Sequence, residues 1–197
     1  IPSASVSANL QIGAVQAPNL WGHGTVGDVS GASISPGSST GSFGPENGTG
    51  VITIADVAFV DSGRSVSMDI QGAAPGAGYD QIVVSGTVNL SNAQLRLEMG
   101  PGFVPSVGQV FTLIDNDATE PVNGTFAGLP QGSTVTAGGV DLQVSYAGGD
   151  GNDVTLTVTR VPRTWSGAAG NLWSNAGNWM GGVIPQSGDR LRFPAGA

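Results

Sequence analysis

The sequence predicts an all-β protein: a parallel β-helix, or β-solenoid, with a β-rich cap, followed by a small Trp-rich module. Apolar and polar residues alternate over many short segments, as in half-buried strands. Corners such as Ser85-Gly86 and Ser91-Asn92 are too short to hold a crossover helix. Strands this short do not form a stable sheet alone, but they are buried when coils stack. The same alternation suits a β-sandwich, which stays open as the alternative.

The first 50 residues form short β-segments, such as Val6 to Ile12, divided by corners rich in Gly, Ser and Pro. From Ser30 to Gly50 large apolar residues are scarce, and Ile34 and Phe43 are the inward candidates. A flexible linker has a similar composition. The β-pattern on both sides favours coils of the solenoid.

Alternation is clearest from Tyr79 to Met99, where Leu95 and Leu97 share one face and Arg96 and Glu98 take the other. Later strands repeat the pattern. The residues expected to point inward are Leu95, Leu97, Met99, Val140, Leu142, Val144, Val154, Leu156 and Val158. The apolar clusters recur at irregular intervals, without the fixed period of leucine-rich or nonapeptide repeats.

The amino-acid composition changes near Arg160, after which three of the four tryptophans occur. We therefore expect a solenoid over residues 1–160, with a cap at about 100–160, and a Trp-rich linker module over 161–197 that starts a following repeat. The first residue is Ile1 and the last residues follow a strand-like LRFPAGA. We expect a piece of a longer polypeptide.

Charge and composition exclude several classes of partner and favour one cellular location. The formal charge is -8 with a pI near 4.2, which argues against nucleic acid or an anionic membrane as a partner. No run approaches the ~18 apolar residues of a membrane span. Zero cysteines exclude disulfides and a Cys nucleophile. The acidic, Lys-free, Gly-rich composition favours a secreted or cell-surface location.

Catalytic residues are not predicted. The single histidine, His23, lies between two glycines, which is typical of a solvated turn. Asp69, Asp80 and Glu98 are expected to stand singly at corners or on outward strand positions. A polysaccharide-cleaving β-helix enzyme would need two or more acids on adjacent coils. It is kept as an alternative.

Two acidic loops are candidate calcium sites, with Asp115, Asp117, Asp150 and Asp153 as the ligands. Asp115-Asn116-Asp117 offers oxygen ligands but lacks the EF-hand spacing. The stretch 148–153 matches the start of the calcium-binding nonapeptide, G-G-x-G-x-D, in one copy only. Tight turns are the favoured interpretation, so no cofactor is expected and calcium is not expected to be obligatory.

The tryptophans Trp165, Trp173 and Trp179 have two interpretations. Aromatic rings stack on sugars, so the three residues could form a carbohydrate-binding site. They could also be the core of a small module with little other apolar mass, which we favour.

A resemblance to a known family rests on several motifs in order: GYDQIVVSGTVNL, VGQVFTLIDND, VNGTFAGLPQG and VDLQVSYAGGDGNDVTLTV. Together with an SPG corner at Ser35–Gly41 and a W-x7-W-x5-W tail, they resemble the end of the passenger-like β-helices of giant bacterial surface proteins with autotransporter-type β-strand repeats. The resemblance implies a non-enzymatic structural or adhesive segment of a secreted bacterial surface or fibre-forming protein. A carbohydrate-binding module is the alternative from another class.

Assembly follows from the two ends of the chain. Apolar alternation runs close to both ends, and no polar capping segment is visible at either. Terminal coils without caps present unpaired backbone groups that recruit another strand. We therefore expect copies or neighbouring repeats to join head to tail, with glycans or a host surface as further partners.

Overall fold

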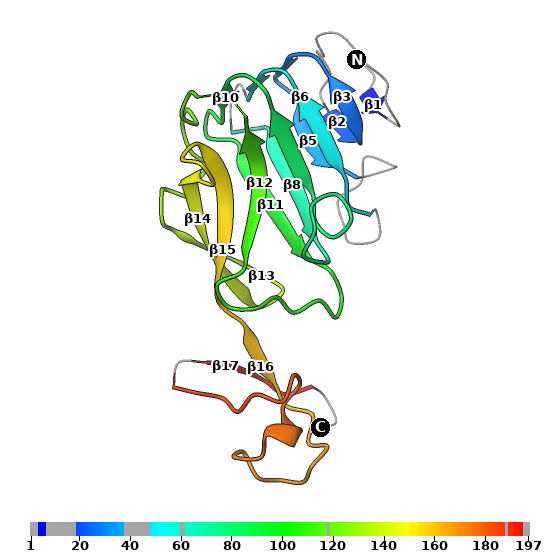
Figure 1. Ribbon diagram of the computed structural model, residues 1–197, viewed down its shortest axis with the longest axis vertical. Coiled ribbons are helices and arrows are strands. Elements are labelled where there is room, and N and C mark those ends of the chain that lie inside the picture. The colour runs from blue at the N-terminus through cyan, green and yellow to red at the C-terminus, as the bar shows by residue number, and fades with distance from the viewer. Residues whose placement is uncertain are drawn as a thin grey trace.

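The chain folds into a parallel β-solenoid of about five turns, seen in the computed structural model of Figure 1. The structure describes residues 4–6, 19–37, 48–59, 62–117, 119–187 and 189–194. Sheet A, the first face of the solenoid, contains β1 (Ala4–Val6), β2 (Asn19–Gly22), β5 (Ser33–Pro36), β8 (Ser65–Ile70) and β11 (Gln94–Met99), in that order. Sheet B begins with β3 (Gly24–Val26), β6 (Val51–Ile54), β9 (Gln81–Val84) and β12 (Val110–Asn116). Sheet C contains β4 (Val29–Ser30), β7 (Val57–Ala58) and β10 (Val88–Asn89).

Each coil passes through sheets A, B and C in turn, so residues far apart in sequence stack in register. Leu20 pairs with Ile34, Ile34 with Val66, and Val66 with Leu95. The paired residues are 14, 32 and 29 positions apart in the sequence. Because these separations differ, no fixed period is visible in the sequence. The first three residues of this ladder are at most 1% exposed, and they belong to one continuous apolar core.

Coil length varies because chain is inserted at the corner between sheets A and B. Two of these insertions are closed at the base by glycines whose backbones touch. A Cβ on Gly50 would lie 2.6 Å from the Cα of Gly37, and one on Gly78 would lie 2.8 Å from the Cα of Gly72. Such distances are shorter than van der Waals contact, so only glycine allows the chain to leave the coil and return at these points.

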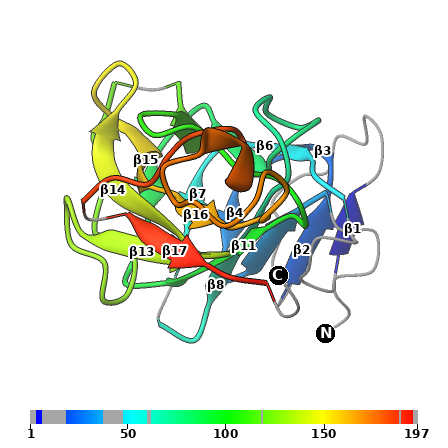
Figure 2. The same cartoon turned by 90° about the horizontal axis from the view of Figure 1, so that it is seen from below.

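The C-terminal end of the coil stack is capped. β15 (Asp153–Arg160) runs antiparallel along β12 in the position that a further coil would take, and β14 (Val140–Gly148) and β13 (Thr134–Ala137) extend the same sheet. Figure 2 shows this cap and β1 at opposite ends of the stack. These antiparallel strands are the cap expected at the C-terminal end of the solenoid, and β15 occupies the backbone groups of β12 that a further coil would use.

Burial confirms most of the predicted inward set. Six members, from Val140 to Val158, are at most 2% exposed. Leu95, Leu97 and Met99 are half-buried and pack against the core, because β11 is the last strand of sheet A. Ile34 is buried as predicted, whereas Phe43 and residues 7–12 lie outside the described residues.

A small module follows the cap. β16 (Pro162–Thr164) continues from β15 and pairs in parallel with β17 (Arg190–Arg192), and a short 3₁₀ turn, η2 (Ala176–Asn178), lies between them. Asn178 is fully buried; its Oδ1 accepts from the N–H of Ala169 at 2.6 Å and its Nδ2 donates to the carbonyl of Leu172 at 3.0 Å. One amide therefore holds the loop of the module in place. In the part of the chain that the structure describes, no helix has the length and apolar character needed to cross a membrane.

Candidate functional site

Aromatic rings form the centre of the C-terminal module. Trp165, Trp173 and Trp179 contact each other with ring centroids 5.0 to 6.3 Å apart, and Phe193 lies 5.6 to 6.4 Å from each of them. Trp179 is 2% exposed, and its Nε1 donates to the carbonyl of Trp173 at 2.9 Å. Trp173 and Phe193 remain 53% and 52% exposed. Trp179 is therefore a core residue, while Trp173 presents its ring to solvent.

The module also exposes aliphatic side chains. Besides Trp173 and Phe193, the exposed large apolar residues of the module are Leu172, Met180, Val183, Ile184 and Leu191. For a module that spans residues 161–197 this is a high apolar exposure, and exposed apolar surface of this kind is typical of contact sites. The module therefore offers a candidate interaction surface.

A salt-bridge network ties the module to the cap. Asp141 of β14 lies 3.2 Å from Arg190 of β17 and 3.8 Å from Arg160. Inside the module, Arg163 and Asp189 form a pair at 3.0 Å. Cavities of about 420 and 380 Å³ lie beside β16, between the module and the solenoid. The sequence interpretation missed Phe193, Asp141 and Arg190, and none of them belongs to a motif that would have drawn attention to it.

The four candidate calcium ligands come from two loops that the fold brings together. The Oδ1 of Asp153 accepts from the N–H of Asn116 at 2.9 Å, so the turn before β15 lies against the end of β12. Burial raises the pKa values of Asp115 and Asp153, and the charges of neighbouring acids, Asp117 and Asp150 among them, raise them further. Even so, no set of three acidic or histidine side chains within the described ranges has the arrangement of a metal site. The Asp153 hydrogen bond reaches a backbone N–H of another strand, so it joins the turn before β15 to the end of β12.

We expect that removing calcium with a chelator will leave the melting temperature nearly unchanged. Among the described residues these acids repel each other and form no ligand set, so we expect the folded state to hold no tightly bound ion. Differential scanning calorimetry with and without EDTA measures this. Added calcium serves as the control, and a rise of many degrees on adding it would contradict the prediction.

A second acidic cluster lies on sheet A. Asp69 of β8 is in register with Glu98 of β11, and Asp80 joins them from the return of the 71–80 insertion. The two carboxylate oxygens of Asp80 accept from the N–H groups of Gly50 at 2.8 Å and Asp69 at 2.9 Å. The expectation that these acids stand singly is wrong, because the register between coils is not visible in the sequence.

Asp69 and Glu98 place two carboxyl groups on adjacent coils, which a polysaccharide-cleaving β-helix enzyme would need. Asp69 and Asp80 are only 4% and 1% exposed, however, and Asp80 is committed to two backbone donors. A carboxyl group that a substrate cannot reach cannot transfer a proton to it. The cluster of Asp69, Asp80 and Glu98 is therefore better explained as structural, because the hydrogen bonds of Asp80 hold the end of the 71–80 insertion against the solenoid.

The cluster makes stability depend on pH. Burial, together with the charge of Glu98, raises the pKa of Asp69 from 3.8 to about 6, and burial raises that of Asp80 to about 8. The folded state thus holds protons that the unfolded chain has released above about pH 4, so stability falls as pH rises from about 4 to about 8. We expect a higher urea midpoint at pH 5 than at pH 7.5.

The variant Asp69→Asn removes one buried charge, so it should raise the midpoint at pH 7.5 and reduce the difference between the two pH values. Asp28→Asn is the control, because Asp28 is exposed between β3 and β4. Equal midpoints at both pH values in the parent chain would show that these carboxyl groups are not held in the protonated form.

Taken together, the fold defines the class of protein: a capped parallel β-solenoid that carries a small aromatic module. Comparison with protein-family models, with curated proteins and with solved structures found no match.

Proposed function

We propose that this chain is a non-enzymatic structural or adhesive segment of a secreted bacterial surface or fibre-forming protein. Its contact with copies of itself, or with neighbouring repeats, is head to tail. The observation that carries the proposal is the edge of β17 that no described strand covers, in a module that exposes apolar side chains. The solenoid supports a structural role, because continuous backbone ladders along the coil stack give a stiff body.

Two strands offer matching edges. Among the described strands, β17 pairs only with β16, and β1 pairs only with β2, in both cases in parallel. The carbonyl of Arg192 accepts from the N–H of Trp165 at 2.8 Å, so the N–H and C=O of Leu191 point to the other edge of β17. A parallel strand added there would continue the ladder, and β1 of the next copy is the strand that we assign to it.

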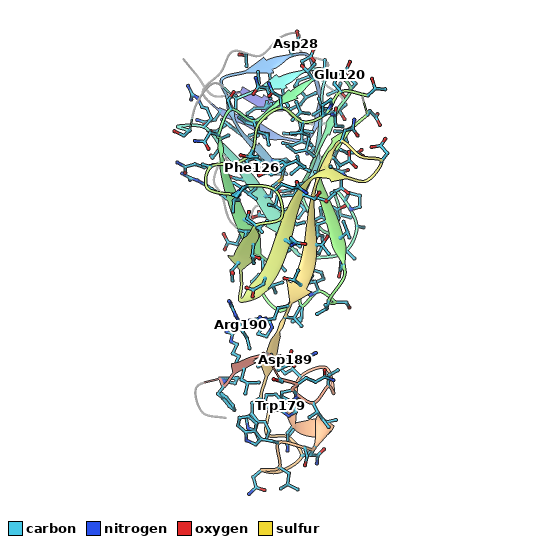
Figure 3. The ribbon with its side chains drawn as sticks, turned by 90° about the vertical axis from the view of Figure 1, so that its left-hand side faces the viewer. Asp28, Glu120, Phe126, Trp179, Asp189 and Arg190 are labelled. Carbon is cyan, nitrogen blue, oxygen red and sulfur yellow. The ribbon has the colours of Figure 1, made fainter. Side chains whose placement is uncertain are left out.

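Charge supports a contact between unlike ends. Residues 160–197 hold four arginines and one aspartate, a formal charge of +3, whereas residues 1–159 hold two arginines and 13 acids, a charge of -11. In Figure 3, Asp28 and Glu120 lie at one end of the long axis, with Asp189, Arg190 and Trp179 at the other. Opposite charge attracts the module of one copy to the solenoid of another and disfavours contact between two solenoid bodies.

Sedimentation velocity and negative-stain microscopy test the assembly. We expect linear oligomers at low salt that shorten as salt rises, because screening weakens the attraction between the ends. A monodisperse monomer at every salt concentration would contradict the proposal.

Leu191→Pro is the sharpest variant, since it removes the outward N–H of β17 without touching the ladder to β16. It should abolish oligomers. Leu191→Ala keeps the N–H and is the matched control, which should still assemble. Equal assembly by the two variants would show that the β17 edge is not the contact.

A further inference from the structure

The outward face of sheet A carries a shallow trough that crosses four strands, β2, β5, β8 and β11. Two rows of side chains line this face: Asn19, Ser33, Ser65 and Gln94 in one, and Trp21, Ser35, Ser67 and Arg96 in the other. The inner strands contribute only serines, while the outer strands contribute the larger side chains. The small residues form the floor of the trough, and Trp21 and Arg96 stand at its two ends.

The trough has a defined size. It contains a cavity of about 150 Å³ lined by residues of both rows. This is smaller than the ~300–1,000 Å³ of typical small-molecule pockets. Three strand spacings separate its ends, about 14 Å in all. The cavity has room for about one ring of a ligand, and the rest of a longer ligand would lie along the sheet.

The chemistry of the lining is that of a sugar site. Trp21 is half-buried, and its indole can stack on the apolar face of a pyranose ring. Serine hydroxyls both donate and accept hydrogen bonds, as sugar hydroxyls do. The exposed Arg96 forms no ion pair in the part of the chain that is described, so its N–H donors are available to ligand oxygens.

We propose that this trough binds a short, neutral oligosaccharide, with Trp21 stacking on one ring and Arg96 donating to hydroxyls farther along. A neutral ligand is favoured over an acidic one because Glu98 follows two residues after Arg96 on the same face, with Asp69 in register beside it. Residues 1–159 also carry a charge of -11. The site is separate from the Trp165 cluster and does not depend on end-to-end assembly.

Isothermal titration of the full chain with defined trisaccharides tests the proposal. The neutral probes are cellotriose, maltotriose and the trimer of N-acetylglucosamine, and the acidic probe is a galacturonic acid trimer. We expect at least one neutral trimer to bind. Trp21→Ala and Arg96→Ala should each weaken that binding about tenfold or more, a loss of about 1.4 kcal/mol or more.

Two further variants make the result specific. Ser35→Leu fills the trough between its ends and should abolish binding, whereas Trp173→Ala changes the exposed ring of the module and should leave binding unchanged. If Trp21→Ala loses its circular dichroism spectrum, the exposed Arg96 provides the deciding variant. The proposal is overturned if no neutral trimer binds at millimolar concentration, if only the acidic trimer binds, or if Trp173→Ala rather than Arg96→Ala removes the binding.

Discussion

Replacing Phe111 with alanine is expected to lower the free energy of unfolding by about 3–5 kcal/mol. Phe111 is fully buried on β12, the strand that joins the last coil to the cap. Its ring contacts Tyr79 edge-on at 5.3 Å and Phe103 at 6.4 Å. Truncation would remove both aromatic contacts and leave a cavity between solenoid and cap, which the paired strands on either side of β12 cannot close.

Val110→Ala is the matched control. Val110 precedes Phe111 on the same strand but is 51% exposed, so its truncation should change stability by no more than about 0.5 kcal/mol. Urea titration of both variants measures the contrast. Similar losses in the two variants would mean that the assigned direction of the β12 side chains is incorrect.

Replacing Trp179 with alanine should unfold the C-terminal module while the solenoid stays folded. Trp179 is 2% exposed and contacts the rings of Trp165, Trp173 and Phe193. Truncation of a buried tryptophan costs about 3–5 kcal/mol, and a module this small has little other apolar burial to offset the loss. Near-ultraviolet circular dichroism should lose the part of the tryptophan signal that comes from the module, while Trp21 of the solenoid keeps its contribution, and limited proteolysis should remove the chain after β16.

Trp173→Ala provides the comparison for this variant. Trp173 is 53% exposed, and its backbone carbonyl still accepts from Trp179 in the variant. The module should remain protease-resistant. A module that survives loss of Trp179 as well as it survives loss of Trp173 would not have an aromatic core.

The strands of the solenoid and of its cap could be predicted from the sequence because alternation within a strand is a local property. Val140, Leu142 and Val144 alternate with polar residues, and all three are buried. Alternation also predicts that Leu97 points inward, and it does. The sequence does not predict that Leu97 is only half-buried, because this depends on β11 being the last strand of its sheet.

Contacts between coils could not be predicted. Asp69 and Glu98 are 29 residues apart, and they meet only because the insertions between them set the length of that coil. The approach of Asp153 to Asn116 depends likewise on the reversal of the chain in the cap. Alternation in a sequence gives the face of a residue, but register between coils depends on loop lengths that follow no period here.

The reversal of β15 also decides how the molecule would carry tension. β15 is hydrogen-bonded on both sides, to β12 and to β14, and it runs directly into β16. A pull on the C-terminal module therefore acts along the axis of β15, across ladder bonds that lie perpendicular to it. In this shear arrangement the bonds of both ladders share the load together, whereas a strand pulled sideways would release them one at a time. The cap thus places a strand that is hydrogen-bonded on both sides where a force applied to the C-terminal module would enter the solenoid.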